Sequence, residues 1–475
     1  MKPSLPSILH LSLALVLLIL SGSCSRTEEQ QKSNIVFILM DDLGWTDVGY
    51  MGSDYYETPH IDRLAGAGMI FTQAYANAAN CAPTRACLLS GQYSPRHGIY
   101  TVARPDRGRS EDRRLIPVVN SREISLDKIT IAEAIAPEGY VSAAIGKWHV
   151  GNIPLEQGFS FSIVRHEMGY DGHFNEDGEY LTDRLTDEAI QFISRNKNRP
   201  FFLYMAHHAV HTPIQAKKPV IEKYSNKEKS GCHKHATYAA MIESMDESVG
   251  RIDSTLKELG LSENTLLVFF SDNGGHGTFT CQKPLRGGKG MFYEGGIRVP
   301  MFVHWPGRVE AGTTCDLPVI STDFYPTFVE LAGAKSPEDY PLDGRSLLPL
   351  LEGANELERE AIFWHFPAYL QAYEGLRDES RDPLFRTRPV SVIRKGDWKL
   401  LLFHEEWILD GGIADMATNH SVELYNLAKD PGEEMDLANV ETVKRDELLN
   451  DLLEWQQSVH APVPDEPNPE YKSEP

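Results

Sequence analysis

The chain has 475 residues and carries 68 acidic against 46 basic side chains, giving a formal net charge of −22 at pH 7. This length allows a large hydrophobic core and two packed units. An apolar share of 41% and a charged share of 24% are ordinary for a soluble globular protein. The acidic balance argues against nucleic acid as a partner, because that role requires a basic surface.

The N-terminus resembles an export signal. Lys2 supplies positive charge, and Leu13–Leu20 is an apolar run too short to span a bilayer. The segment Leu20–Cys24 is similar to a loose bacterial lipobox. We therefore expect a signal peptide over residues 1–23, a lipid anchor at Cys24 and a polar tether over 24–32, and so a periplasmic or cell-surface lipoprotein of a bacterium. Cleavage by ordinary signal peptidase, with Cys24 incidental, is the alternative.

The first element after the tether is predicted to be a buried strand. Ile35–Met40 is a continuous apolar run typical of a parallel strand. Asp41 and Asp42 follow it, at the end of a strand where open α/β sheets place their sites. Their oxygens suit Ca²⁺ or Mg²⁺. Taken alone, an Asp-Asp pair is more often a solvated loop start.

The stretch Asn80–Gly91 contains a cysteine in an unusual setting. Pro83 suits the first turn of a helix, so Cys81 would lie at the helix N-terminus, where anions are favoured. Arg85 falls one turn later on the same face. A reactive side chain beside a fixed cation suits an anionic substrate. A buried structural cysteine is the alternative, and these residues alone do not decide between the two.

Residues 104–114 hold five arginines among three acidic residues, in a loop that contains proline and glycine. Such a run is usually a solvated loop. A contact with the substrate near the active-site pocket is the alternative.

Two further segments present charged or titratable side chains after apolar runs. Gly139–Gly146 is strand-like and ends in a glycine turn that delivers Lys147 and His149 to one side, where a cation and an acid–base group can flank an anion. A glycine-hinged loop with a surface lysine is the alternative. Phe201–Met205 is another buried-strand candidate, and three histidines follow it, His207, His208 and His211. A structural zinc site would need a fourth ligand, which no matching cluster supplies.

The middle of the chain continues the alternation of helix and strand that is typical of α/β proteins. Residues 242–259 have the three- and four-residue apolar spacing of an amphipathic helix that ends at Gly260. Leu266–Phe270 is a strand candidate followed by Asp272 and Asn273. A turn is the usual role of such a sequence, but at a strand end these residues can supply carboxylate and amide oxygens to a metal.

A glycine-rich segment, residues 286–290, surrounds Lys289, whose ammonium group can donate to the oxygens of an anion. It lacks the spacing of a phosphate-binding P-loop. Cys87, Cys232, Cys281 and Cys315 can form disulfides in an exported chain, but their connectivity cannot be read from sequence.

After about residue 360 the pattern changes to short strands separated by turns, with candidates at 390–394, 398–403 and 422–426, and a helix over 440–455. No catalytic cluster is found here. Residues 461–475 are rich in proline and glutamate, which predicts disorder.

Six of these stretches, in this order, resemble the type I sulfatases. Cys81–Arg85 reads Cys-Ala-Pro-Thr-Arg and is similar to the Cys-x-Pro-(Ser/Thr)-Arg core of that family, with Ser90 where threonine is more usual. The opening strand with its Asp-Asp pair and the segment Gly139–His149 also match. The resemblance implies an alkaline-phosphatase-like α/β fold, a mixed sheet sandwiched by helices. It implies a catalytic domain over 33–360 and a smaller C-terminal α+β subdomain over 361–460.

The resemblance also implies roles for individual residues. Cys81 would be converted to formylglycine by a formylglycine-generating enzyme, and the substrate would be a sulfated carbohydrate or aryl sulfate. One Ca²⁺ would be held by Asp41, Asp42, Asp272 and Asn273, and formylglycine would contact it. The remaining roles are stabilisation of the formylglycine hydrate by Arg85, binding of sulfate by Lys147 and Lys289, proton removal by His149 and protonation of the leaving oxygen by His211.

Two alternatives to a sulfatase stay open at this point. One is a phosphomonoester or phosphonate hydrolase of the same superfold, although two-zinc phosphatases need Asp and His ligands beyond this one-metal set. The other is a surface glycan-binding lipoprotein without catalysis, in which Cys81 stays unmodified.

Overall fold

The computed structural model describes residue 1, residues 32–373 and residues 379–472. The predicted signal peptide, the lipid anchor at Cys24 and most of the tether lie outside the described residues. Among the helices that are described, none has both the length and the apolar character needed to cross a membrane.

The main sheet of the described chain has nine strands in the order β4-β3-β5-β1-β6-β7-β2-β8, with β9 paired to β2. The predicted strands 35–40, 201–205 and 266–270 are β1, β5 and β6, and β1 pairs parallel with both others. The antiparallel pairs of β7 with β6 and β2 make the sheet mixed. The strands are β1 (Asn34–Met40), β2 (Met69–Tyr75), β3 (Val141–Gly146), β4 (Phe161–Ile163), β5 (Phe201–Ala206), β6 (Thr265–Ser271), β7 (Arg298–His304), β8 (Thr313–Cys315) and β9 (Val319–Ile320).

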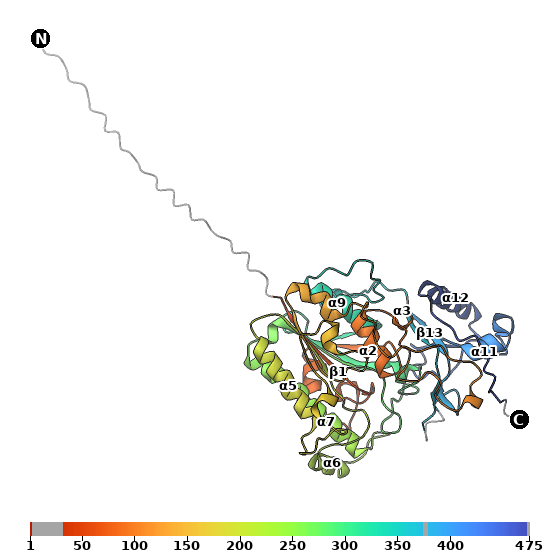
Figure 1. Cartoon of the computed structure of the whole chain (residues 1–475), viewed down its shortest axis with the longest axis horizontal. Helices are drawn as coiled ribbons and strands as arrows, with labels where there is room; N and C mark the ends of the chain where they lie inside the picture. The colour runs from red at the N-terminus through yellow and green to blue at the C-terminus, as the bar shows by residue number, and fades with distance from the viewer. Residues whose placement is uncertain (2–31, 374–378, 473–475) are drawn as a thin grey trace. The chain divides into compact units, whose positions relative to one another are not determined.

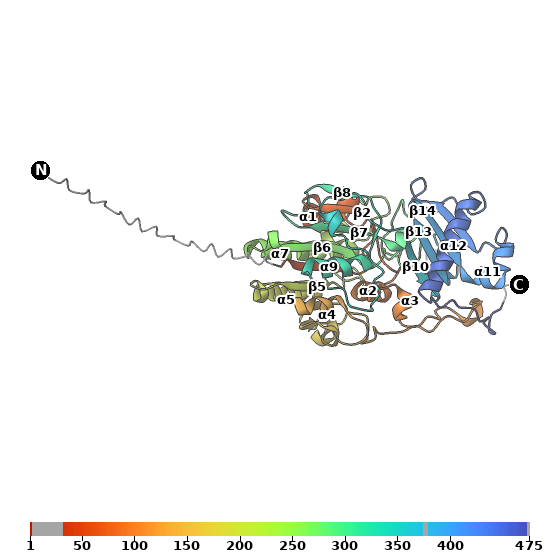
Figure 2. The ribbon, with the colours of Figure 1, turned by 90° about the horizontal axis from the view of Figure 1, so that it is seen from above.

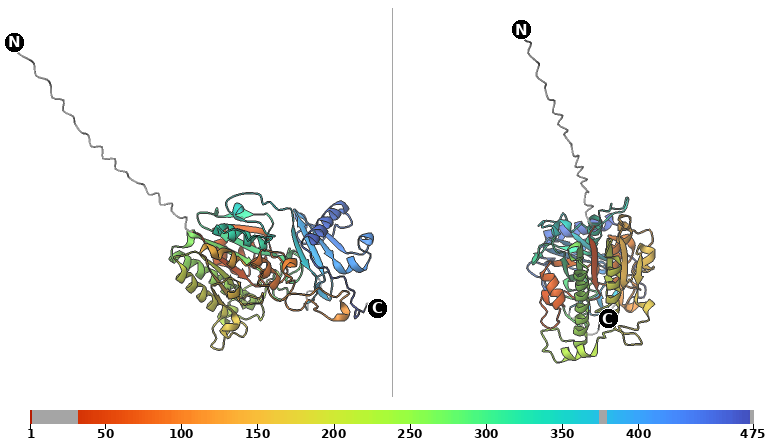
Figure 3. Two further views of the ribbon diagram at one scale, coloured as in Figure 1. Left: turned by 45° about the horizontal axis from the view of Figure 1, so that its top comes forward. Right: turned by 90° about the vertical axis from the view of Figure 1, so that its left-hand side faces the viewer.

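Helices cover both faces of this sheet, because the central strands are apolar on both sides (Figures 1 and 3). Phe37 packs in one core cluster with α4 and α9, whereas Ile38 packs in a second cluster with α5 and α7. The predicted amphipathic helix is α7. The helices around the sheet are α1 (Pro59–Gly66), α2 (Cys81–Ser90), α3 (Ser94–His97), α4 (Ile131–Ile135), α5 (Leu181–Asn196), α6 (Lys218–Ser225), α7 (Ala236–Glu258), α8 (Glu294–Ile297), α9 (Phe324–Ala332) and α10 (Leu348–Leu351).

A second, antiparallel sheet has the order β10-β13-β14-β15, and α12 packs against it (Figure 2). The predicted short strands and the C-terminal helix are therefore confirmed. The core under this sheet also includes Tyr75 and Tyr293, which belong to the larger part of the molecule. The elements are β10 (Ile362–Phe366), β11 (Leu370–Gln371), β12 (Phe385–Thr387), β13 (Val390–Lys395), β14 (Trp398–Phe403), β15 (Val422–Asn426), α11 (His404–Leu409) and α12 (Thr442–Ser458).

Residues 461–472 differ from the disordered tail that their composition predicts. The Asn468 side-chain amide donates to the backbone carbonyls of Ser110 and Arg113, both at 2.8 Å. Leu115 and Pro467 form a bridge of antiparallel type. Contacts with the distant loop around residues 110–115 therefore hold residues 461–472 in place, and the composition of the tail alone could not predict these contacts.

Candidate active site

The predicted site residues meet at one edge of the main sheet, because the carboxyl ends of β1, β3, β5 and β6 lie side by side. Met40 is paired with Ser271, and Gly146 with Ala206. Backbone hydrogen bonds extend beyond the strands, from Asp272 N to Met40 O at 3.0 Å. The residues delivered to this edge are Asp41 and Asp42 after β1, Lys147 and His149 after β3, His211 after β5, and Asp272 and Asn273 after β6.

Four oxygen-bearing side chains form the centre of this site, and each is fully buried: Asp41, Asp42, Asp272 and Asn273. The Asn273 amide nitrogen donates to Asp42 Oδ1 at 2.9 Å. Asp41 Oδ1 and Asn273 Oδ1, however, accept no hydrogen bond from any described residue. Because buried acceptors are rarely left unpaired, these two oxygens indicate a ligand.

Three cations surround the carboxylates. Lys147 Nζ lies 2.5 Å from Asp41 Oδ2, and Lys289 Nζ lies 2.6 Å from Asp42 Oδ2. Arg85, fully buried on α2, donates from Nε to Asp272 Oδ2 at 2.8 Å and from Nη1 to the carbonyl of Lys147 at 2.7 Å. Three negative and three positive charges balance, so a bound divalent cation would leave the centre net positive and suited to an anion.

The pKa values of the carboxylates reflect this balance. Burial raises the pKa of Asp41, but Lys147 and other nearby cations outweigh it and hold that pKa well below its usual range. The pKa of Asp42 is lowered in the same way, mainly by Lys289 against burial. Burial raises the pKa of Asp272 to about 6, despite the opposing charge of Arg85. Asp41 and Asp42 are therefore ionised at neutral pH and available as ligands.

Cys81 begins α2, as predicted, and its side chain points at the same centre. Sγ lies 3.9 Å from Asp42 Oδ1, and the residue is 1% exposed. Burial raises the pKa of the thiol to about 12, although Lys147 and Lys289 oppose the effect. The unmodified side chain is therefore a neutral thiol, because a thiolate here would be desolvated beside two carboxylates.

Two predicted histidines complete the group. His211 Nε2 lies 3.8 Å from Asp42 Oδ2, and Nδ1 donates to the carbonyl of Thr212 at 2.7 Å. Since a carbonyl only accepts, the proton of a neutral His211 ring sits on Nδ1. Burial, reinforced by Lys147, lowers the pKa of His149 to about 3, so this ring is neutral and can accept a proton.

A cleft of about 580 Å³ opens onto this centre. Lys147, His149 and His211 line it. Sequence reasoning missed two further lining residues, Arg165 and His173, since no local pattern distinguishes them, and His208, one of the three histidines after β5, also lines the cleft. His207, in contrast, is fully buried and pairs with Ser248, so it packs in the interior and does not line the cleft.

The donor set fits a hard divalent cation. Within the described residues, Asp41, Asp42, Cys81 and His211 offer ligand atoms within 4.8 Å of one another. Carboxylate and amide oxygens are the donors that Ca²⁺ and Mg²⁺ prefer, and the unpartnered oxygens of Asp41 and Asn273 are of this kind.

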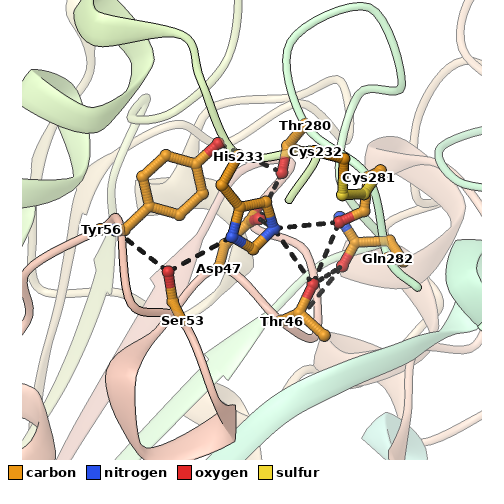
Figure 4. Close-up of a disulfide and its surroundings, with 9 residues drawn as sticks. All are labelled: Thr46, Asp47, Ser53, Tyr56, Cys232, His233, Thr280, Cys281 and Gln282. Atoms are coloured by element: carbon orange, nitrogen blue, oxygen red, sulfur yellow. Dashed lines mark hydrogen bonds and ion pairs between the residues drawn. A yellow bond between two sulfur atoms is a disulfide. The ribbon is translucent and has the colours of Figure 1, made fainter. Parts of the chain in front are cut away.

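One disulfide, Cys232–Cys281, ties two loops beside the site (Figure 4). The sequence alone did not show which cysteines pair, and the structure pairs these two. Because both sulfurs are in the disulfide, they are not available to bind a metal together with the nearby His233. Next to it, buried Asp47 accepts from the Tyr238 hydroxyl at 2.7 Å, and this hydroxyl lies 3.2 Å from the carbonyl oxygen of Asp42. Thr280, next to Cys281, donates to the same Asp47 at 2.5 Å, so a disulfide-linked loop contacts the segment that follows Asp41 and Asp42.

Comparisons with known proteins show which proteins the chain resembles. Residues 33–334 match the sulfatase family model, and residues 287–458 match that of the C-terminal region of N-sulphoglucosamine sulphohydrolase. A sulfatase of Formosa agariphila is 32% identical, covering 88% of this chain and 87% of that protein. N-acetylgalactosamine-6-sulfatase of the dog is 33% identical, covering 74% and 72%. The crystal structure of Ps i-CgsB in complex with k-i-k-neocarrahexaose has a TM-score of 0.70 and 30% identity, covering 94% and 95%.

Proposed function

The chain belongs to the sulfatase family, whose members hydrolyse sulfate esters, and we propose that it releases sulfate from sulfated carbohydrates through a formylglycine derived from Cys81 and one bound divalent cation. The observation that carries this proposal is the convergence of Cys81 Sγ with the buried oxygen cluster of Asp41, Asp42, Asp272 and Asn273.

The four oxygen-bearing side chains would hold the cation, which we take to be Ca²⁺. When bound, the ion would supply positive charge for activating the nucleophile and for the sulfate oxygens. Asp41 Oδ1 and Asn273 Oδ1 would gain the partner that they lack among the described residues. Lys147 and Lys289, which pair with Asp41 and Asp42 here, would then be free to donate to sulfate.

Cys81 begins the Cys-Ala-Pro-Thr-Arg segment and is poorly suited to act as a thiolate, given the raised pKa of its thiol. The hydrated aldehyde carries two hydroxyls on one carbon, one to attack sulfur and a second whose deprotonation allows the aldehyde to re-form as sulfate leaves. An unmodified cysteine or serine has no second hydroxyl for this release. Arg85 would stabilise the hydrate from the same helix.

The two histidines divide the proton transfers. His149, neutral at physiological pH, would accept the proton of the second hydroxyl. His211, partly exposed at the cleft, would carry a second proton on Nε2 and transfer it to the oxygen of the leaving alcohol. The base, His149, follows β3, and the acid, His211, follows β5, so the two lie on different loops.

Sulfated carbohydrates are the favoured substrate class because of the relatives. Dog N-acetylgalactosamine-6-sulfatase acts on a sulfated sugar by its name, and Ps i-CgsB was solved with k-i-k-neocarrahexaose. Aryl sulfates would serve as simple substrates. Family membership favours sulfate over phosphate or phosphonate esters.

Maturation and location follow from the same proposal. A formylglycine-generating enzyme would be an obligatory partner, and the leader with Cys24 would direct the protein to the periplasm or cell surface as a lipoprotein. Mass spectrometry of the N-terminal peptide from membranes tests the anchor: a diacylated Cys24 is expected, and an unmodified peptide cleaved elsewhere would contradict it.

The test of the function is sulfate release from a panel of sulfated oligosaccharides and an aryl sulfate. The protein is co-expressed with a formylglycine-generating enzyme, and Cys81→Ala is the control. We expect release that is abolished in the control. Equal release by Cys81→Ala would contradict the formylglycine mechanism, and no release with the aldehyde confirmed by mass spectrometry would contradict the sulfatase assignment.

A further inference from the structure

The arginine-rich loop at residues 104–114 contains one arginine that stands apart from the other four. Those four interact with acidic side chains or with the loop's own backbone. Their contacts are the ion pairs Arg104–Asp106, Arg109–Asp112 and Arg114–Asp410, and donation by Arg113 to the carbonyls of Asp106 and Gly108. Arg107, like Arg113, has no carboxylate partner among the described residues, but it donates outside the loop, to the carbonyl of Val102 at 2.6 Å. Val102 lines the active-site cleft, so Arg107 is held beside it.

Arg386, on β12, is a second arginine of this kind. It is 5% exposed, yet it forms no ion pair with any described carboxylate. Nε donates to the carbonyl of Gln371 at 2.9 Å and Nη1 to the carbonyl of Lys289 at 3.2 Å. Burying a charge without a counter-charge is costly. A buried, unpaired guanidinium is therefore a candidate for binding an anionic ligand. Arg386 lies against the backbone of Lys289, whose side chain reaches the catalytic centre.

The fold brings these two arginines together from distant segments. The loop lies directly on β12, since a side chain at Gly108 would come within 2.7 Å of the ring of Phe385. Tyr369 N also donates to the carbonyl of Pro105 at 2.8 Å. Burial lowers the pKa of Arg386, and the positive charge of Arg107 lowers it further. Both guanidinium groups stay charged at neutral pH.

Two aromatic rings extend this cationic region. The guanidinium of Arg386 lies 3.7 Å from the centre of the Tyr373 ring. Tyr373 also stacks on His276, whose ring centre is 4.1 Å away. Because these two groups occupy the faces of the Tyr373 ring, Tyr373 holds the Arg386 guanidinium in place through a cation–π contact.

We propose that Arg107 and Arg386 bind a second anionic group, a sulfate or a carboxylate, on the saccharide whose sulfate ester is cleaved. This inference rests on the proposed function and adds to it a substrate class: saccharides with at least two anionic groups close together. Guanidinium forks bind either group through paired hydrogen bonds.

The test compares three disaccharides that differ only in their substituents: one sulfate, two sulfates, or one sulfate and one carboxylate. Arg107→Gln is expected to lower the preference in kcat/KM for a doubly anionic over the monosulfated disaccharide by about 10- to 100-fold, the loss of one or two charged hydrogen bonds. Arg107→Lys should restore part of it. Arg104→Gln, in the same loop but ion-paired and exposed, is the matched control and should leave all three rates unchanged. Whichever doubly anionic disaccharide loses more identifies the group bound.

An unchanged preference in Arg107→Gln, with hydrolysis intact, would overturn the inference and leave the sulfatase function standing. Binding is measured in parallel on Cys81→Ala by calorimetry, and it decides the inference even if no hydrolysis is observed. The inference is supported if Cys81→Ala binds a doubly anionic disaccharide more tightly than the monosulfated one and if adding Arg107→Gln removes this difference. Equal binding of all three disaccharides by Cys81→Ala overturns it.

Discussion

Two buried clusters of charged side chains in this molecule have similar compositions, but they differ in how many of their oxygens have a close donor. The first is the catalytic centre. The second lies under the C-terminal sheet, where Lys399 pairs with Glu294 at 3.0 Å and with Glu433 at 2.8 Å, all three fully buried. There Glu294 also accepts from the Tyr75 hydroxyl, and Glu433 from the backbone N–H of Glu294, both at 2.6 Å.

The difference separates a structural cluster from a ligand-binding one. In the second cluster each carboxylate has one oxygen within 3.0 Å of Lys399 Nζ, and its other oxygen accepts a hydrogen bond from the protein. Glu433 Oε1 accepts no hydrogen bond from any described residue, but its charge is paired with Lys399 at 2.8 Å, so the group joins α8 to β14 without a further ligand. In the catalytic centre, oxygens of Asp41 and Asn273 have no donor among the described residues. Buried charge is therefore not sufficient to identify a functional site, whereas unpartnered acceptors at its centre are informative.

The largest expected effect comes from changing the catalytic cluster. Asp41→Asn should reduce sulfate release by at least about a thousandfold, because it removes a charged ligand of the cation that supplies several kcal/mol of stabilisation. The matched control is Glu433→Gln, a similar neutralisation in the second cluster, which should change kcat/KM by less than about threefold. Comparable losses in the two variants would mean that the clusters do not differ in function.

The second cluster should instead show its importance in stability. Lys399→Met leaves two buried carboxylates without their shared cation and is expected to lower the free energy of unfolding by about 3–5 kcal/mol. Urea titration followed by circular dichroism measures this. Lys395→Met, which breaks ion pairs on the surface of the neighbouring strand, should cost less than about 1 kcal/mol. Equal costs would refute the structural role of Lys399.

Reduction of the disulfide should weaken the support of the catalytic centre. The bridge spans 49 residues, for which the chain-entropy model gives a stabilisation of roughly 4 kcal/mol, with measured values commonly smaller. Cys232→Ala with Cys281→Ala should therefore lower the melting temperature of the folded protein. A melting temperature unchanged by the double substitution and by reductant would show that the bridge contributes nothing.

The smallest effect concerns the pH dependence of stability. Burial raises the pKa of Glu433 to about 7 despite Lys399, against a usual 4.5. The folded state then binds a proton more tightly than the unfolded state, so this group makes the free energy of unfolding fall as pH rises from about 4.5 to 7. Glu433→Gln should flatten that part of the profile. A profile that is the same in both proteins would contradict the raised pKa.

Sequence reasoning predicted the elements whose signals are local. Apolar runs identified β1, β5 and β6, and the residues after β1 and β6 meet in the buried oxygen cluster that we propose as a metal site. Arg386 and Tyr373 were not found, because their significance depends on contacts with Lys289 and His276 from segments about 100 positions away. Similarly, the five arginines of residues 104–114 look equivalent in sequence, and only their partners in the fold distinguish Arg107.

The most direct test of the central claim is the metal content of the purified protein, measured by inductively coupled plasma mass spectrometry after exhaustive dialysis. The account predicts one divalent cation per chain, expected to be calcium, in the wild type and in Glu433→Gln, and a loss of that ion in Asp41→Asn and Asn273→Ala. Retention of the ion by both site variants, or its absence from wild-type protein that releases sulfate, would contradict the assignment of the buried oxygen cluster.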